Sequence, residues 1–445
     1  PPRSTLFPYT TLFRSGRFIQ NGGTATVGSL VLAQTSYDTN PHVGTFDLNG
    51  GILSAASITG GVATAGGVNT STFTFNGGTL KPTADRDTFM YGLTAATVKD
   101  GGAVIDTDGF DIAIAQPLLH ASGAATSPLT KNGEGTLTLT GTNTLLGPVA
   151  INGGTLVLAG NARLSSGSFQ APIHNNGGLV FSGNADQTLL GAVRGSGSVT
   201  QNGAGTLTLG GDTPYAGATT ISAGTLVVGA VSSLSNSAVT FDAGTTLGLK
   251  ISSGDAPWRC KSLTVGAGAV MAELRFSGAV LSETTAPILV DGDIVNNGTL
   301  NVSVSGVSVE LGTYPIIRYT GEMSGNGSLG SVALPNGGEG ALVSNPDNKT
   351  IDLVVSTASS PLVWNGGSGD WDIGATLNWT GYRTTYLDGD LVLFDDTSSG
   401  VAPYTVTLSA SVSPSHVSFD NVTTDYTLVG PGALTGDAAI HKTGA

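Results

Sequence analysis

Residues 129–160 read LTKNGEGTLTLTGTNTLLGPVAINGGTLVLAG, and residues 199–230 read VTQNGAGTLTLGGDTPYAGATTISAGTLVVGA. The two stretches align without a gap at an offset of 70 residues, and 15 of the 32 aligned positions are identical. The last seven residues, 439–445, read AIHKTGA and fit the opening of a third copy. Self-similarity of this length indicates a repeat architecture.

Each copy contains two short segments with the alternation of a β-strand. In Gly135–Thr140, Leu137 and Leu139 face one side while the threonines between them face the other. Thr155–Leu158 shows the same pattern with more apolar residues. Asn-Gly and Gly-Gly pairs stand between these segments and supply the positive backbone angles that tight turns require. Each copy therefore predicts two strands joined by sharp turns.

A shorter motif, Asn-Gly-Gly followed by a strand-like pair, recurs along the chain. It begins at Asn49, Asn76, Asn152 and Asn176, so the gaps are 27, 76 and 24 residues, close to multiples of about 25. A strand and a sharp turn in every unit are typical of a stacked solenoid, because a single unit cannot bury its own apolar face.

Two architectures fit this pattern, a parallel β-helix and an antiparallel sandwich in which the Asn-Gly pairs are hairpin turns. The near-fixed period and the equivalent turn positions favour the β-helix. We therefore predict an all-β fold, a right-handed parallel β-helix followed by strand-rich C-terminal β modules. Residues 16–251 would form about 10 coils, or about 45 Å at ~4.8 Å per coil. The one stretch where a helix could intrude is Ala84–Lys99.

The composition excludes several classes of protein. Glycine supplies 67 of the 445 residues and charged residues only 11%, which argues against a helical bundle, and the glycines lack the period of three of collagen. The net charge of −14 predicts no nucleic-acid partner. No apolar run approaches the ~18 residues of a membrane helix, so no membrane insertion is expected. Cys260 is the single cysteine, expected to be an inert small residue.

Changes in composition divide the chain into five parts. Residues 1–15, PPRSTLFPYTTLFRS, resemble a translated sequencing adapter and are expected not to be native. Residues 16–254 form the repeat region, and 255–355 a strand-rich continuation that caps the solenoid. Residues 356–361 form a linker, and 362–445 a tryptophan-rich module ending in the truncated repeat. Because the chain starts with an adapter-like segment and ends in a truncated repeat, we expect an internal fragment of a longer protein.

The tryptophan-rich module admits two interpretations. Trp364, Trp371 and Trp379 lie within sixteen residues of one another. Flat aromatic faces can stack on sugar rings, but a small β module also needs large side chains for its core. The core interpretation is favoured, and burial of all three tryptophans would exclude the sugar platform.

Charged residues offer few candidates for chemistry. Asp85, Arg86, Asp87, Lys99 and Asp100 are the best candidates for a polysaccharide lyase or hydrolase on one face of a β-helix, although a polar loop is the favoured explanation of them.

Two acidic motifs resemble parts of calcium sites. Asp106–Asp111 reads DTDGFD, like half of a calcium loop, and residues 366–370 read GGSGD, one residue short of a calcium repeat. Solvated turns are the favoured interpretation of both. The five histidines show no zinc-binding spacing. We therefore assign no catalytic, cofactor-binding or metal-binding residue.

The motif NGxGTLTLxG followed after about ten residues by GTLVL or GTLVV, as in 132–158 and 202–228, resembles the autotransporter-associated β-strand repeat. That resemblance implies a passenger segment of a bacterial secreted or surface-displayed protein, with an extracellular or outer-membrane-associated location and no catalytic residues. The expected function is a non-catalytic stalk or adhesin-like scaffold without cofactors, whose partners are extracellular glycans or host and matrix surfaces. The alternatives are a carbohydrate-binding protein acting through the aromatic module and a β-helical polysaccharide lyase or hydrolase.

Overall fold

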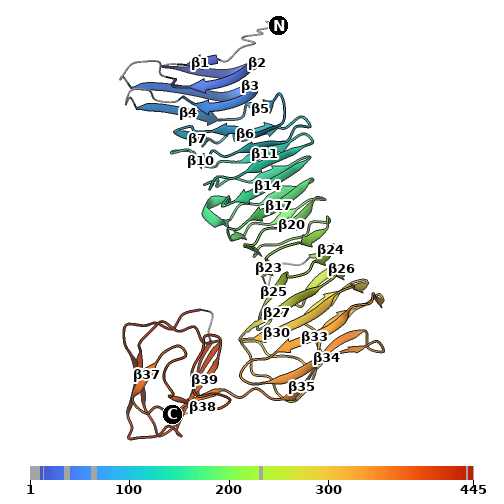
Figure 1. Ribbon diagram of the computed structural model, residues 1–445, viewed down its shortest axis with the longest axis vertical. Helices are drawn as coiled ribbons and strands as arrows, with labels where there is room; N and C mark the ends of the chain where they lie inside the picture. Colours follow the sequence, from blue (N-terminus) through green and yellow to red (C-terminus); the bar gives the residue numbers. More distant parts are fainter. Residues whose placement is uncertain are drawn as a thin grey trace. The chain divides into compact units, whose positions relative to one another are not determined.

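The protein is almost entirely β-structure, as predicted (Figure 1). The computed structural model describes residues 11–13, 15–34, 41–61, 68–229, 234–436 and 439–443. Within these residues the only helical element is one 3-10 turn, η1 (Ser165–Gly167). The chain forms two compact units, Pro1–Val227 with Val231–Thr240, and Val228–Ala230 with Phe241–Ala445. Across the described ranges no helix has the length and apolar character needed to span a membrane.

The first unit is a stack of parallel strands, which Figure 1 shows one above the next from blue to green. Phe46 pairs with Phe73, and Phe73 pairs with Ala96, so neighbouring strands are successive coils of the chain. Parallel pairs between successive coils confirm the β-helix and exclude the antiparallel sandwich here, whereas the right-handed sense stays a prediction. The strands that begin in this unit are β1 (Thr11–Phe13), β2 (Gly16–Leu32), β3 (His42–Gly60), β4 (Asn69–Phe75), β5 (Thr79–Pro82), β6 (Arg86–Tyr91), β7 (Ala95–Val98), β8 (Ala103–Asp106), β9 (Ile112–Ile114), β10 (Leu118–His120), β11 (Leu129–Asn132), β12 (Thr136–Leu139), β13 (Val149–Ile151), β14 (Thr155–Gly160), β15 (Ser168–Phe169), β16 (Ile173–Asn175), β17 (Gly178–Gly183), β18 (Gln187–Leu189), β19 (Val193–Arg194), β20 (Ser198–Gln201), β21 (Thr206–Leu209), β22 (Thr219–Ile221), β23 (Thr225–Val228) and β24 (Leu234–Phe241).

The alternation of leucine and threonine sets the core of the stack. Leu137, Leu139, Leu156 and Leu158 are buried, while the threonines of β12 are partly exposed. In-register stacking places Leu137 on Leu156 and Leu139 on Leu158, which extends one apolar core from coil to coil. Burying each leucine contributes about 1.5–3 kcal/mol, and no coil could bury its leucines alone.

The two repeat copies have the same internal pairing but occupy different columns of strands. In the first copy β11 pairs with β13, and β12 with β14. In the second copy β20 pairs with β22, and β21 neighbours β23. The column that contains β12 and β14 continues through β17 into β20, the first strand of the second copy. The second strand, β21, instead lies in the sheet of β15 and β18.

The length of the coils varies more than the near-fixed period predicts. A long coil separates Leu30 from its partner Ile58, whereas a much shorter one separates Leu137 from its partner Leu156. The interval between Asn76 and Asn152 therefore does not count coils at one corner, because these asparagines follow different columns of strands. Stacking fixes the pairing of the strands, while the turns between them vary in length.

No helix intrudes at Ala84–Lys99, the one stretch where the sequence left room for it. Residues 86–91 form β6, which pairs with β3 and β9, and residues 95–98 form β7, which pairs with β4 and β10. The apolar residues Phe89, Met90, Ala96 and Val98 are all buried in the same core as their neighbours in the stack. Coil-to-coil pairing therefore overrides the local helical preference of this stretch.

The glycines of the repeat are required where coils meet. Gly135 has a φ of +86°, and a Cβ there would collide with the carbonyl oxygen of Phe110 in the preceding coil. Gly154 has a φ of +62°, and its Cβ would collide with the carbonyl oxygen of Gly135. Successive coils approach too closely at this corner for any side chain.

The second unit begins with further parallel strands and then changes direction. β25, β27, β30 and β33 form one sheet, while β26, β28 and β31 pair in parallel beside it. β35 runs antiparallel to both β31 and β34, which ends the parallel progression. The bounds are β25 (Thr246–Ser252), β26 (Trp258–Val265), β27 (Ala269–Ser277), β28 (Ile288–Val290), β29 (Ile294–Asn296), β30 (Thr299–Ser305), β31 (Gly312–Tyr319), β32 (Met323–Ser324), β33 (Ser328–Ala333), β34 (Glu339–Asn345) and β35 (Thr350–Thr357).

The tryptophan-rich region has its own core and returns to parallel stacking. One sheet contains β36, β39, β41 and β43 in parallel with β38 antiparallel to β36, and a second contains β37, β40 and β42. This region is therefore a further β-helical stack and not an antiparallel sandwich. Its strands are β36 (Leu362–Trp364), β37 (Gly369–Trp371), β38 (Trp379–Thr380), β39 (Leu391–Asp395), β40 (Tyr404–Leu408), β41 (His416–Asp420), β42 (Tyr426–Val429) and β43 (Ala439–Thr443).

The two ends of the chain are described only in part. Residues 1–10 and 14 of the expected adapter segment lie outside the described residues, and Thr11–Phe13 forms β1, which pairs with β2. In the expected third repeat, β43 pairs in parallel with β41, while residues 444–445 lie outside the described residues. The adapter origin of residues 1–15 stays a prediction.

Candidate functional site

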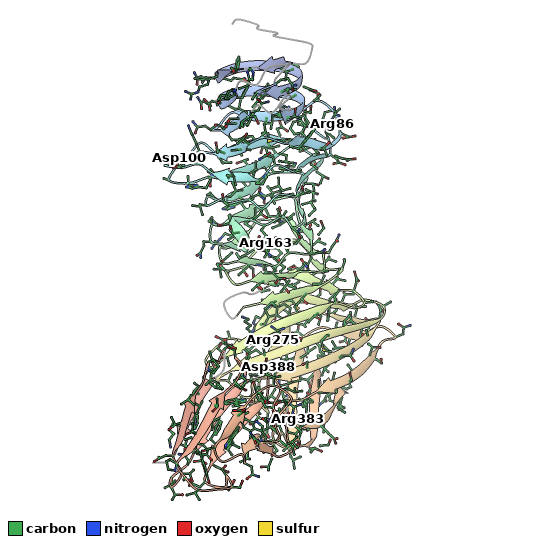
Figure 2. All side chains as sticks on the ribbon, turned by 60° about the vertical axis from the view of Figure 1, so that its left-hand side comes forward. Arg86, Asp100, Arg163, Arg275, Arg383 and Asp388 are labelled. Atoms are coloured by element: carbon green, nitrogen blue, oxygen red, sulfur yellow. The ribbon has the colours of Figure 1, made fainter. Side chains whose placement is uncertain are left out.

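Three of the five residues considered for a lyase or hydrolase, Asp85, Arg86 and Asp100, bind the backbone of neighbouring coils. Figure 2 shows Arg86 and Asp100 at opposite edges of the stack. Arg86 donates through Nε to the carbonyl oxygen of Ala56 at 3.3 Å, and Asp100 Oδ1 accepts from the backbone nitrogens of Ala125 and Thr126 at 2.7 and 2.9 Å. Each of these two side chains therefore binds the backbone of a neighbouring coil.

Aspartates at the coil corners form a recurring structural feature that sequence reasoning missed. Asp85 Oδ1 accepts from Asp111 N at 2.9 Å, and Asp111 Oδ1 in turn accepts from Thr136 N at 2.7 Å. Asp186 repeats the contact with Thr206 N at 2.8 Å, and Thr206 is the residue of the second copy that aligns with Thr136. Each carboxylate satisfies a backbone donor of the next coil, a contact with a charged acceptor.

Two aspartates of the calcium-like loop at Asp106–Asp111 pair with a lysine of the protein itself. Lys81 Nζ lies 3.2 Å from Asp106 Oδ2 and 3.1 Å from Asp108 Oδ2, and the hydrogen bond to Asp108 is the main cause of its raised pKa. Asp106 Oδ1 also accepts from Asp108 N. The lysine of the preceding coil thus supplies the positive charge, and the turn interpretation is the better one. Within the described residues no cluster of three metal-ligating side chains occurs.

Buried amines and amides occupy the corner that follows the first strand of each repeat. Lys131 is fully buried, and its Nζ donates to the carbonyl oxygens of Asn132, Gly133 and Gly153 at 3.0, 2.7 and 3.1 Å. Burial lowers the pKa of this amine. Gln201, the equivalent residue of the second copy, donates through Nε2 to the carbonyl oxygens of two glycines, Gly203 and Gly205.

Three of the four asparagines that begin the Asn-Gly-Gly motifs each bind an asparagine of the preceding coil. Asn49 Nδ2 donates to Asn21 Oδ1 at 2.9 Å, and Asn76 Nδ2 donates to Asn49 Oδ1 at 3.1 Å. Asn152 makes the same contact with Asn132 at 2.8 Å. These side chains hold the corners of adjacent coils in register, a role beyond the turn formation that their Asn-Gly pairs indicate.

The three tryptophans of the C-terminal region are core residues. Trp364, Trp371 and Trp379 are 0, 0 and 1% exposed, and their rings pack edge to face at centroid distances of 5.0 and 5.3 Å. Tyr386 and Phe394 complete the same cluster. The hypothesis that these tryptophans form a sugar platform is therefore wrong, because no ligand can reach their faces.

The single cysteine is part of the core of the second unit. Cys260 is fully buried in β26, and burial raises the pKa of its thiol to about 12. A thiol of this kind is unreactive at neutral pH, as the sequence interpretation expected.

A polar groove in the second unit is a feature that no motif indicated. It has a volume of about 560 Å³ and lies among the loop containing Glu283, strand β31 and the β34–β35 hairpin. Its lining includes Arg318, Asn345 and Asp352. Because these residues are separated in sequence and carry no characteristic spacing, only the fold brings them together.

Comparison with known proteins identifies the repeat. Residues 129–158 and 199–228 match the Passenger-associated-transport-repeat family. The chain is 29% identical over 230 residues to the Adhesin BmaC autotransporter of Brucella suis biovar 1 (strain 1330), an alignment that covers 47% of this chain and 6% of that adhesin. The chain therefore spans a small part of the length of the relative it matches.

The parallel coils, the position of the repeat within them and these similarities define the class of the molecule. The chain is a passenger-type protein of the autotransporter group, carrying two passenger-associated transport repeats. It is a surface-displayed passenger with an extracellular, outer-membrane-associated location.

Proposed function

We propose that this passenger segment is a non-catalytic stalk and adhesin-like scaffold. The observation that carries the proposal is the use of its charged and amide side chains. Lys81, Lys131, Asp100 and Asp111 bind neighbouring coils, so these groups serve the stack instead of a reaction. Stability of this kind accumulates from one coil to the next, as a load-carrying extension needs.

The strands that end the parallel progression support a second part of the proposal. Residues 255–355 act as a cap, because β35 covers β31 in antiparallel pairing and removes that strand's free edge. Two hydrogen bonds join Ser359 to Val309. Ser359 N donates to Val309 O at 2.8 Å, and Val309 N donates to Ser359 Oγ at 2.7 Å. The expected linker at 356–361 is therefore tied to the cap in this arrangement.

Adhesion to extracellular glycans or to host and matrix surfaces is the proposed activity. The similarity to a protein named as an adhesin supports it, and the net charge of −14 favours polar or basic partners over anionic ones. Carbohydrate binding through the buried tryptophans is not part of the proposal.

An adhesion assay tests the proposal by comparing the chain with a variant whose core is disrupted. Beads coated with the chain should adhere to epithelial monolayers or immobilised matrix proteins, whereas beads coated with Leu156→Asp, which places a charge in the core of the stack, should not. Adhesion equal to that of uncoated beads contradicts the adhesive role, and release of reducing ends from a polysaccharide panel contradicts the non-catalytic one.

A further inference from the structure

The groove of the second unit has three walls from separate parts of the chain. Glu283 and Thr284 come from the loop before β28, Arg318 from β31, and Asn345 from the end of β34. Arg318 Nη2 donates to the carbonyl oxygen of Thr284 at 3.5 Å, which connects the loop to the strand. The volume of about 560 Å³ falls within the range of small-molecule sites.

The charges around the groove narrow the chemistry of a ligand. Two carboxylates, Glu283 and Asp352, disfavour an anion such as phosphate, while the guanidinium of Arg318 disfavours a metal cation. The lining has no aromatic side chain and a single apolar residue, a proline, so an apolar ligand would lose its hydration without gaining contacts. With an anion, a metal cation and an apolar ligand disfavoured, the lining fits a neutral ligand that both donates and accepts hydrogen bonds.

Hydrogen-bonding groups in the groove are set up for such a ligand. Asp352 is only 7% exposed, and its Oδ2 accepts from Asn345 Nδ2 at 3.1 Å. Asn345 Oδ1 accepts from Asn348 N at 3.3 Å, which fixes the amide and leaves the carboxylate as an acceptor. Hydroxyl groups donate to carboxylates and accept from guanidinium, so a polyol satisfies both kinds of group at once.

A buried hydroxyl adds an independent observation. Thr350 is 2% exposed, lines the groove, and its Oγ1 has no hydrogen-bond partner among the described residues. A buried hydroxyl without a partner is a cost to the folded protein, which a ligand hydroxyl beside it would remove.

We propose that this groove binds a neutral sugar residue of a surface glycan, with its hydroxyls donating to Asp352 and accepting from Arg318 while Thr350 contacts one of them. The inference rests on the proposed adhesive function and names the chemical class of the partner. It also places sugar recognition on side chains other than the tryptophans.

The experiment uses the full chain and a panel of neutral mono- and disaccharides at millimolar concentration, observed by saturation-transfer NMR. We expect at least one sugar to bind, and Asp352→Asn and Thr350→Val to weaken it about tenfold or more, the loss of one hydrogen bond to a buried polar or charged group. Asp347→Asn makes the same charge change on an exposed residue of the same hairpin and should bind like the unmodified chain.

Two results of the NMR experiment overturn the inference. One is the absence of saturation transfer from every sugar in the panel, and the other is unchanged binding by Asp352→Asn and Thr350→Val. Neither variant should lower the thermal unfolding midpoint of the unmodified chain, which separates lost binding from lost structure. If beads adhere through Asp352→Asn as well as through the original chain, the groove inference fails while the adhesive function stands.

Discussion

The side chain of Asn336 binds the backbone of Leu391 through two hydrogen bonds, although the residues are 55 positions apart. Nδ2 donates to the carbonyl oxygen at 2.8 Å, and Leu391 N donates to Oδ1 at 2.9 Å. Asn336 is 5% exposed, and its own carbonyl oxygen accepts from Ser360 N. One carboxamide thus takes the place of a neighbouring strand for β39 and joins the tryptophan-rich stack to the turn before β34.

Removing this carboxamide should destabilise the second unit. Asn336→Gly keeps the φ of +50° without strain and deletes only the side chain, so the buried N–H and C=O of Leu391 lose their partners. We expect a loss of about 2 kcal/mol in the free energy of unfolding. Urea unfolding followed by tryptophan fluorescence measures it, since the core tryptophans lie in the adjoining stack. An unchanged midpoint would show that the link is not needed.

Lys131 offers a test of the buried corner. Lys131→Gln copies the residue at the equivalent position of the second repeat and should be tolerated to within about 1 kcal/mol. Lys131→Met removes the amine donor from the carbonyl oxygens of Gly133 and Gly153, while Asn132 O keeps the bond from Thr107 N, and should cost about 2–3 kcal/mol. Denaturant unfolding monitored by circular dichroism compares them; equal stability of the two variants contradicts the role assigned to the amine.

The same lysine predicts a pH dependence. Burial lowers its pKa in the folded state below the ordinary value of 10.5, so the unfolded chain binds more protons between the two values. The free energy of unfolding should therefore rise with pH across that window. Lys131→Gln lacks the titrating group. The free energy of unfolding of the chain should therefore rise relative to that of this variant from neutral pH towards pH 10.5. A constant difference would mean that the pKa is not lowered.

Asp396 predicts an acid sensitivity in the C-terminal stack. The backbone nitrogens of Val422, Thr423 and Thr424 donate to its carboxylate at 2.9, 3.0 and 2.9 Å. The backbone bond from Val422 is the main cause that lowers its pKa to about 2, below the ordinary 3.8. Stability from this carboxylate is fully present above about pH 4 and falls as the pH drops towards 2. Asp396→Asn should flatten this decline in an acid titration of tryptophan fluorescence. Asp425→Asn, an exposed change on the loop that contains Val422–Thr424, should not.

Cys260 reports on the opening of β26. Because the thiol is buried and its pKa is raised to about 12, a thiol reagent at about pH 8 should leave the native chain unmodified over hours and react fully in denaturant. Mass spectrometry after timed labelling makes the measurement. Rapid labelling of the native chain would show that β26 opens readily.

The repeat predicted the parallel stack because its information is local. Leu137 and Leu139 indicate a buried face by alternation, and the Asn-Gly pairs indicate the corners, so both the strands and their stacking follow from the residues. Ala84–Lys99 misled the prediction because its pairing partners in β3, β4, β9 and β10 lie outside any local window.

The polar contacts between coils could not be predicted from the sequence for a related reason. Asp85 faces Asp111 N only because the intervening coil has a particular length, and the paired strands show that this length differs from coil to coil. The one usable signal was the alignment of Lys131 with Gln201, which share long donor-bearing side chains at the same repeat position. The groove around Asp352 has no such signal, because its walls come from unrelated segments.

The shift of the second repeat into another column has an evolutionary meaning. β20 continues the column of β12, β14 and β17, while β21 joins β15 and β18. A duplication of this repeat therefore lengthens the protein and, at the same time, turns the copied side chains towards a different direction. Mutation and selection can then reshape one flank of the molecule for a new contact while the ancestral flank is preserved.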